Sequence, residues 1–257
     1  MNMKHIESES NASLKQWKKL HTKKEREKSG TFLLEGPHLI EEAIASGAKL
    51  QHVIVEENFE INETWLKEKF SLWSVPAKLM KQLSETEKPQ GIIAVCEMMD
   101  QSEELIKNGG RYLLIDGVQD PGNLGTIIRT ADSAGLDGVF LGEGTADLYN
   151  GKTVRSTQGS LFHLPIVKAN LLEIIEQCKE HDLPVLSTSL QNAVDMRELA
   201  EVDGFALIMG NEGAGVQEIL QQESTLNVKI PIFGSAESLN VSVATGILLY
   251  ELQRNRM

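Results

Sequence analysis

From Arg111 onward, short apolar runs alternate with segments that have the periodicity of helices. Five of these runs have the length and composition of strands, at residues 112–115, 138–141, 183–186, 205–209 and 228–230. Strands that alternate with helices form parallel sheets that are covered by helices on both faces. The sequence therefore predicts an α/β domain over residues 111–257, built on a mostly parallel sheet.

A smaller α/β domain is predicted over residues 29–98. Its candidate strands are shorter, at residues 32–34, 53–55 and 92–95, and helix-period segments lie between them. Residues 99–110 are polar and end in Asn108-Gly109-Gly110, which is typical of a linker. Residues 1–28 form a basic N-terminal arm in this division of the chain.

Composition narrows the class of protein. The chain has 257 residues, of which 41% are apolar and 24% charged, as expected for a globular protein of two domains. It contains no apolar stretch near the roughly 20 residues of a membrane-spanning helix, so we expect a cytoplasmic protein with no membrane partner. The two cysteines, Cys96 and Cys178, are far apart and form no CxxC pair. We therefore expect structural cysteines and no metal.

Charge is unevenly distributed along the chain. The net charge is −12, which is unusual for a nucleic-acid binder. Residues 1–30 nevertheless hold eight basic and four acidic side chains, with Trp17 among them as a possible stacking face for a base. An RNA-binding arm and a solvated amphipathic helix both fit this pattern. In the first interpretation the RNA contacts are Lys15, Lys18, Lys19, Lys23, Lys24 and Arg26.

The first polar cluster follows the candidate strand at residues 112–115. Pro121 and Gly122 predict a turn that opens a helix with an apolar stripe. We place Asn123 in the loop or at the N-cap of this helix, and Arg129 in its second turn. An asparagine cap and a helical arginine also have a purely structural interpretation.

The second cluster, residues 210–215, follows an entirely apolar strand. Its glycines allow close approach of the backbone to a ligand, and Glu212 places a carboxylate among exposed amides. The glycine order is GxxGxG and not the GxGxxG of dinucleotide-binding folds, which argues against a nicotinamide-dependent oxidoreductase. No GxSxG motif is present, so a serine hydrolase is also disfavoured.

The third cluster comprises Ile230-Pro231-Ile232 and residues 238–246. The helix predicted at about residues 241–254 is apolar on more than one side. A dimer interface and burial within its own domain both explain that pattern. In a parallel sheet all three clusters fall at the carboxyl ends of strands, where ligands bind.

Together the three clusters resemble the motifs of the SpoU (TrmH-like) family of RNA ribose 2′-O-methyltransferases, within the SPOUT class. The matching segments are residues 120–129, residues 209–215, and Ile230-Pro231 with residues 238–244. The resemblance implies a deep trefoil knot in the C-terminal domain, an exception to the rule that protein chains are not knotted. The upstream block, with Phe32-Leu33-Leu34-Glu35-Gly36, is similar to the small substrate-binding domain of many members, which is L30e-like.

The resemblance also implies a cofactor and a set of site residues. S-adenosylmethionine is expected to bind mainly through backbone groups at Gly210, Ile230 and Leu239, with apolar flanks packing on the adenine. Met209 and Pro231 are further expected cofactor-binding residues. The catalytic residues carried over from the family are Asn123, Arg129, Glu212, Ser238 and Asn240. Two roles for Arg129 are open: the base for the 2′-hydroxyl, or a cation that binds the adjacent phosphate and stabilises the developing alkoxide. A guanidinium is effectively always charged, which favours the second role.

The implied substrate is ribosomal RNA, by analogy with family members that also carry a separate substrate domain and a basic arm, and the large subunit is favoured. A transfer RNA substrate is the alternative within the same chemistry. A non-catalytic RNA-binding assembly factor on the same scaffold is a further alternative, disfavoured by the intact polar residues. Members of the family are usually homodimers, and we expect the same here.

Overall fold

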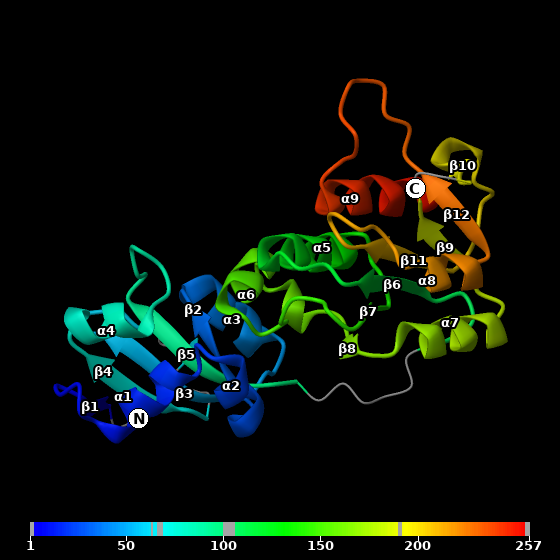
Figure 1. The fold of residues 1–257 in the computed structure, drawn as a ribbon. Coiled ribbons are helices and arrows are strands. Elements are labelled where there is room, and N and C mark those ends of the chain that lie inside the picture. The colour runs from blue at the N-terminus through cyan, green and yellow to red at the C-terminus, as the bar shows by residue number, and fades with distance from the viewer. Residues whose placement is uncertain (1–2, 63, 66–68, 100–105, 190–191, 255–257) are drawn as a thin grey trace. The chain divides into compact units, whose positions relative to one another are not determined.

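The protein divides into two units in a computed structural model that describes residues 3–62, 64–65, 69–99, 106–189 and 192–254. The first unit consists of Met1–Asp100 with Asp147–Phe162. The second consists of Gln101–Ala146 with His163–Met257. Figure 1 shows the chain coloured by residue number.

The second unit contains a seven-stranded sheet in the order β10-β12-β9-β11-β6-β7-β8, and every neighbouring pair is parallel. Its strands are β6 (Arg111–Asp116), β7 (Gly138–Leu141), β8 (Ile166–Lys168), β9 (Val185–Thr188), β10 (Val194–Asp195), β11 (Phe205–Gly210) and β12 (Leu226–Lys229). The central strand β11 is buried along its whole length. The predicted parallel sheet is therefore confirmed, and the structure adds the short strands β8 and β10.

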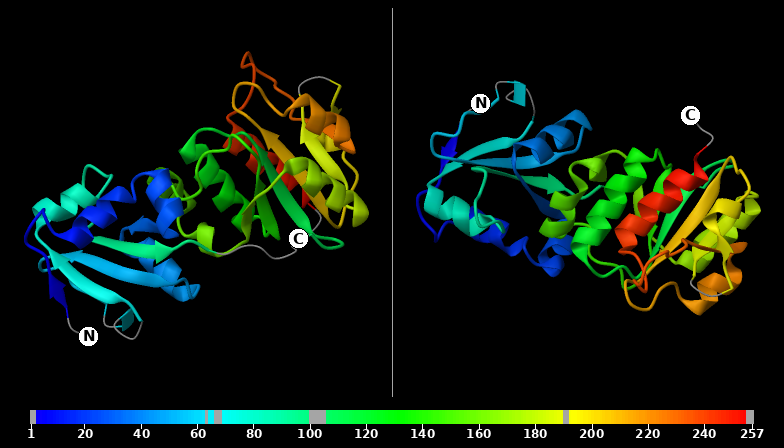
Figure 2. Two further views of the ribbon diagram at one scale, coloured as in Figure 1. Left: turned by 60° about the horizontal axis from the view of Figure 1, so that its bottom comes forward. Right: turned by 90° about the horizontal axis from the view of Figure 1, so that it is seen from above.

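Helices cover both faces of this sheet. The helices are α5 (Pro121–Ser133), α7 (Leu171–Glu180), α8 (Glu218–Glu223) and α9 (Val241–Leu252), with a short 3₁₀ helix at Met196–Glu198. Figures 1 and 2 show α5 and α9 side by side on one face, and α7 and α8 on the other. Alternate side chains of the strands, such as Tyr112 and Leu114, pack in one core cluster with α7. The trefoil knot stays a prediction.

The first unit contains a five-stranded mixed sheet with the order β1-β4-β3-β5-β2. Its strands are β1 (Lys4–His5), β2 (Thr31–Glu35), β3 (Leu50–Glu56), β4 (Ser71–Val75) and β5 (Ile92–Glu97). Its helices are α1 (Ala12–Lys19), α2 (Lys23–Ser29), α3 (Pro37–Ala45), α4 (Ala77–Leu83) and α6 (Gly151–Thr157), followed by a 3₁₀ helix at Ser160–Phe162. This architecture agrees with the small α/β domain expected from the sequence.

The N-terminal segment departs from the predicted separate arm of residues 1–28. The apolar side of α1 packs into the core of the first unit, where Leu14 and Leu20 are buried beside strands β3 and β4. Trp17 is only 2% exposed, and its ring lies 5.3 Å from that of Trp73 in an edge-on arrangement. Trp17 is a core residue and offers no free face to a base.

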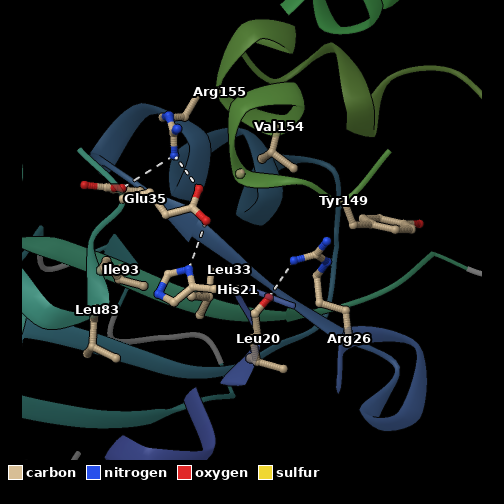
Figure 3. A pocket seen from close by; sticks show the side chains of 12 residues that line it. Leu20, His21, Arg26, Leu33, Glu35, Leu83, Ile93, Tyr149, Val154 and Arg155 are labelled. Atoms are coloured by element: carbon tan, nitrogen blue, oxygen red, sulfur yellow. Dashed lines mark hydrogen bonds and ion pairs between the residues drawn. The ribbon is translucent and has the colours of Figure 1, made fainter. Parts of the chain in front are cut away.

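The second departure from the predicted boundaries is the excursion of residues 147–162, which belongs to the first unit. The ring of Tyr149 packs against Phe32 of β2 at 4.6 Å. Arg155 of α6 lies 3.7 Å from a carboxylate oxygen of Glu35 and 3.3 Å from one of Glu85. Figure 3 shows Arg155 and Glu35 among the residues that line a small cavity. Aromatic and charged side chains thus attach α6 to strand β2, which sequence periodicity does not reveal.

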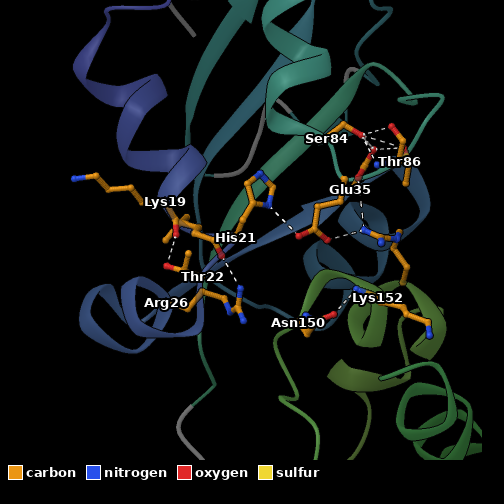
Figure 4. Close-up of polar contacts among 12 residues, drawn as sticks. Lys19, His21, Thr22, Arg26, Glu35, Ser84, Thr86, Asn150 and Lys152 are labelled. Atoms are coloured by element: carbon orange, nitrogen blue, oxygen red, sulfur yellow. Dashed lines mark hydrogen bonds and ion pairs between the residues drawn. The ribbon is translucent and has the colours of Figure 1, made fainter. Parts of the chain in front are cut away.

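A second ion pair holds the same excursion. The guanidinium of Arg26 donates to the Leu20 carbonyl at 2.7 Å and to the Asp147 carboxylate at 2.6 Å. Figure 4 shows this side chain turned inward from α2. Only 3% of Arg26 is exposed. The predicted RNA contact at Arg26 is therefore corrected: its buried charge is paired with the partly buried carboxylate of Asp147.

Glu35 is a second buried charged residue in the described part of the first unit. It accepts hydrogen bonds from the hydroxyls of Ser84 and of Thr86, the latter at 2.6 Å, and both are visible in Figure 4. With Arg155 nearby, the carboxylate has the partners that a buried charge requires.

Three further sequence predictions concern the linker, membrane-spanning helices and the two cysteines. Part of the predicted linker, residues 100–105, lies outside the described residues. None of the helices in the described part of the chain is both long and apolar enough to span a membrane. Cys96 and Cys178 are free and buried, and burial raises the pKa of each thiol, to about 12 and about 11. These cysteines are structural.

Asp147→Ala tests the attachment of the excursion to the first unit. The substitution leaves the Arg26 guanidinium buried without its counter-ion, which costs about 3 to 5 kcal/mol in comparable buried pairs. We expect a loss of this size in the free energy of unfolding, measured by urea denaturation. Lys24→Ala, at an exposed position of the same helix, is the control and should change stability by less than about 0.5 kcal/mol. A loss below about 1 kcal/mol for Asp147→Ala would contradict the assignment.

Candidate active site

A cleft of about 990 Å³ opens at the carboxyl ends of strands β9, β11 and β12. Thr188, Gly210 and Lys229, the last residues of these strands, all line it. The predicted site residues that line it are Met209, Gly210, Glu212, Ile230, Ser238, Leu239 and Asn240. The predicted residues Asn123, Arg129 and Pro231 are not part of its lining. The site thus occupies the edge of the sheet that parallel topology favours.

The loop after β11 is closed on itself by hydrogen bonds. The backbone groups of Asn211 and Gly215 exchange two bonds of 3.0 Å each. The Asn211 side chain accepts from the amides of Gly213 and Ala214 and donates to the carbonyl of Gly117 at 2.8 Å. One asparagine therefore shapes the loop and attaches it to the end of strand β6.

Two glycines are required by this loop, for different reasons. A Cβ on Gly210 would lie 2.2 Å from the carbonyl carbon of Gly215 and from the amide nitrogen of Val216, so no larger residue fits. Gly215 has φ +73°, in the left-handed region that favours glycine. Gly213 shows neither constraint, although we predicted the same role for all three.

Asp116 fixes the far end of the loop. It is 3% exposed, and its carboxylate accepts from the backbone amide of Gln217 at 2.7 Å and from the Gln217 side chain at 2.5 Å. Gln217 is the N-cap position of α8. The ends of β6 and β11 are thereby held together around the loop.

Glu212 projects from this loop toward the start of α5. One carboxylate oxygen accepts from the backbone amide of Gln119 at 3.1 Å. The other accepts from the backbone amide of Asp120 at 3.1 Å and from the Asn123 side chain at 3.0 Å. Three donors on the two oxygens make this carboxylate an anchor between the second cluster, in the loop after β11, and the first cluster, at the start of α5.

Asn123 extends the connection to the third motif. Its side-chain oxygen accepts from the Asn240 amide at 3.0 Å. Asn240 is the N-cap of α9, and its own oxygen accepts from the backbone amides of Ser242 and Val243 at 2.9 and 3.4 Å. A continuous chain of hydrogen bonds therefore runs from Glu212 through Asn123 to the start of α9.

These bonds also set the charge of Glu212. Burial acts to raise the pKa of the Glu212 carboxyl, but the hydrogen bonds from Asn123 and from the backbone of Gln119 and Asp120 outweigh it and lower the pKa. The group is ionised at neutral pH with its oxygens already engaged. Glu212 is consequently a poor proton acceptor and a strong positioning group.

The start of α5 differs from the prediction. Asp120 is the N-cap, accepting from the Asn123 amide at 2.8 Å, and Pro121 is the first helical residue. Asn123 therefore lies within the first turn, where its side chain is free to join Glu212 and Asn240. The reason is the Asp-Pro pair: proline suits the first helical position and keeps the preceding residue extended.

Arg129 lies in the third turn of α5, one turn later than predicted. Its side chain is exposed and makes no hydrogen bond or ion pair within the described residues. Ser238 is also exposed on the cleft. The structure thus brings Asn123, Glu212 and Asn240 into contact, and leaves Arg129 and Ser238 unengaged.

Sequence reasoning missed Asp116, Asn211 and Gln217. A carboxylate at the end of an apolar strand and an asparagine that opens a glycine-rich turn are signals for the first two. Nothing local marks Gln217, because its partner lies 101 residues away.

The five predicted RNA-contacting lysines are all exposed on α1 and α2 of the first unit. Lys18 donates to Gln82 at 3.0 Å, and Lys23 lies 3.9 Å from Glu27. Among the described residues, no group of three or more histidine, cysteine, aspartate or glutamate side chains has an arrangement suited to a metal ion.

Glu212→Gln tests the anchor through its pH dependence. Because the folded pKa is below the ordinary value of 4.5, Glu212 stabilises the fold above that pH, and the contribution is lost as pH falls through the folded pKa. We expect the wild type to lose more unfolding free energy than the variant between about pH 6 and pH 3, measured by urea denaturation. Glu180→Gln, at an exposed glutamate of α7, should follow the wild-type curve. Parallel curves for the wild type and Glu212→Gln would refute the anchoring role.

Comparisons with known proteins agree with this geometry. The model of the SpoU rRNA methylase family matches residues 110–250, and the model of an MRM3-like substrate-binding domain matches residues 11–94. The 23S rRNA (guanosine(2553)-2′-O)-methyltransferase RlmP of Bacillus subtilis is 49% identical over 251 residues, which cover 98% of this chain and 100% of that protein.

Two solved structures are similar along nearly their whole length. The AdoMet-bound rRNA methyltransferase of Sinorhizobium meliloti has a TM-score of 0.89 with 31% identity, covering 99% of each chain. The SpoU methyltransferase AviRb of Streptomyces viridochromogenes, in complex with AdoMet, has a TM-score of 0.87 with 29% identity, covering 96% of this chain and 98% of that one. The parallel sheet, the three joined loops and the matched sequence agree: the chain belongs to the SpoU rRNA methylase family.

Proposed function

We propose that this protein transfers the methyl group of S-adenosylmethionine to a ribose 2′-hydroxyl of large-subunit ribosomal RNA, and that it acts in the cytoplasm as a homodimer. The observation that carries the proposal is the hydrogen-bond chain Glu212-Asn123-Asn240, which joins the three motifs around one cleft. The names of the B. subtilis and S. meliloti relatives support the reaction, the cofactor and the RNA class.

The cleft fits a nucleoside-containing cofactor. Backbone comes close to its floor at Gly210, where a Cβ would meet the chain at 2.2 Å. Met209 and Ile230 supply apolar surface, and Leu239 keeps 37% of its surface exposed on the cleft, where a purine would cover it. Residues Met209, Gly210, Ile230 and Leu239 would hold S-adenosylmethionine, with Pro231 shaping the adjoining chain. When bound, that group supplies an electrophilic methyl for in-line transfer to oxygen.

Arg129 is the candidate for contact with the reacting ribose. Its side chain is exposed on α5, the helix whose first turn carries Asn123, and it has no partner within the described residues. The guanidinium binds the phosphate beside the target ribose and stabilises negative charge that develops on the 2′-oxygen. This role requires a permanent charge, which arginine provides at every physiological pH.

Glu212, Asn123 and Asn240 are positioning residues in this mechanism. Their hydrogen bonds hold the start of α5 and the start of α9 at fixed distance from the loop after β11. Proximity and orientation account for a large part of the acceleration of a displacement reaction. Ser238, exposed on the cleft, completes the polar rim that faces the ribose.

Arg129→Ala and Arg129→Lys distinguish the two roles of this residue. We expect methyl transfer to fall by about 10²-fold to 10³-fold for Arg129→Ala, with unchanged binding of S-adenosylmethionine, because Arg129 does not line the cleft. Arg129→Lys should be slow at all pH values, measured from pH 6 to 10. Ser133→Ala, on the exposed side of the same helix, is the control. Full activity of Arg129→Lys at high pH would favour a base instead.

The exposed lysines of α1 and α2 are proposed as phosphate contacts. Lys15, Lys19 and Lys24 have no ion pair within the described residues. Replacing all three by alanine should reduce the slope of log affinity against log salt by about 2, at about 0.7 for each contact to single-stranded RNA. Filter binding over a salt series measures the slope. Alanine at Lys49, Lys81 and Lys88 removes the same charge elsewhere on the first unit and should leave the slope unchanged.

The dimer is proposed to form through α9. Val243 and Tyr250 are 51% and 54% exposed, and Ile247 lies between them on the same side of the helix. Such a stripe is typical of a subunit interface. We expect Val243→Asp with Tyr250→Asp to reduce the mass in sedimentation from twice 28.4 kDa to 28.4 kDa. Ile219→Asp, at an exposed apolar residue of α8, is the control. A wild type that sediments as a monomer would rule the dimer out.

The function is tested by incubating the purified protein with methyl-labelled S-adenosylmethionine and an unmodified 23S rRNA transcript. Complete nuclease digestion should release the label in one 2′-O-methylnucleoside. A transfer RNA transcript should stay unlabelled. Label on a base, or on transfer RNA alone, would contradict the proposal.

A further inference from the structure

Phe233 is the most exposed of the large apolar side chains in the described part of the protein, at 86%. It lies in the loop of residues 230–240 between β12 and α9. Figure 1 shows this loop, in orange, extending away from the sheet. A single exposed apolar residue needs no explanation by itself, so the position and neighbours of Phe233 decide its role.

The loop places Phe233 beside the cleft but outside it. Ile230 and Ile232 line the cleft, whereas Pro231 and Phe233 do not. Phe233 is therefore close in the chain to two residues of the cleft wall without being part of the cleft lining itself.

Arg197 holds the ring from one side. Its guanidinium carbon lies 5.8 Å from the centre of the Phe233 ring, within the range of a cation–π contact. Two side-chain hydrogen bonds to Asp195, at 2.9 and 2.5 Å, orient the guanidinium. These bonds from Arg197 lower the pKa of Asp195 to about 2, so both groups stay charged at neutral pH. The aromatic ring thus has a cation on one side and most of its surface free.

We propose that Phe233 and Arg197 form a stacking platform for an unpaired base of the RNA substrate next to the ribose that is methylated. The inference rests on the proposed function. Proteins that read single-stranded RNA stack its bases on aromatic rings and on guanidinium planes. Lys229, exposed at the end of β12 and lining the neighbouring cleft, provides positive charge for an adjoining phosphate. This pairing of an aromatic with cations suits RNA better than a second copy of the acidic chain.

The experiment compares Phe233→Leu and Phe233→Trp with Ile219→Ala, an exposed apolar control on α8. Binding of an unmodified 23S rRNA transcript is measured directly, together with KM and kcat for its methylation. We expect Phe233→Leu to weaken RNA binding and raise KM about tenfold, with kcat, affinity for S-adenosylmethionine and sedimentation mass unchanged. Phe233→Trp should bind RNA within about twofold of the wild type, because its ring also stacks.

Three results would overturn the platform: wild-type RNA binding by Phe233→Leu, an equal defect in Ile219→Ala, or a halved sedimentation mass that marks a subunit contact. Failure of the proposed function is separate. It would appear as wild-type protein that binds the transcript without methylating it, and the binding comparison would still decide the role of Phe233.

Discussion

The arrangement of the cleft depends on the hydrogen bonds that the Glu212 carboxylate accepts. It accepts from two backbone amides just before α5 and from the side chain of Asn123, which in turn accepts from the N-cap of α9. The start of α5, the loop that carries Glu212 and the start of α9 come from three different parts of the chain. A carboxylate with three donors has the acceptor capacity to join them, and a neutral amide has fewer acceptor sites. The anchor therefore requires a carboxyl group that stays ionised, and the lowered pKa of Glu212 keeps it so.

Other contacts make this anchor possible. Gly210 lets the chain return against itself, and Asn211 closes the turn from which Glu212 projects. Asp116 fixes the end of the same loop through Gln217. The cleft is lined by glycines, apolar side chains and polar side chains, and among its charged groups Glu212 is engaged by hydrogen bonds. In our proposal, Arg129 and Phe233 then act on the RNA side, Arg129 with an exposed guanidinium and Phe233 with its ring beside Arg197.

Much of this arrangement is predictable from the sequence, because strand and helix periodicities and three motifs lie within continuous segments. The parallel sheet, the helix after Pro121 and the capping role of Asn240 follow from local rules. The features that the sequence analysis assigned wrongly depend on partners that are distant in the chain. Trp17 and Arg26 have the local pattern of an exposed basic helix, yet the strands and Asp147 bury them. The attachment of α6 to the first unit rests on side-chain contacts with β2 and Glu85, which no periodicity encodes.

Methylation of ribosomal RNA in cells tests the central claim most directly. Ribose 2′-O-methyl marks are mapped across total RNA from cells with the gene, without it, and with a Glu212→Ala copy. The proposed function predicts that one mark in large-subunit ribosomal RNA disappears without the gene, returns with the wild-type copy, and stays low with the variant. Unchanged ribose methylation in all three strains, from a protein that still binds S-adenosylmethionine, would contradict it.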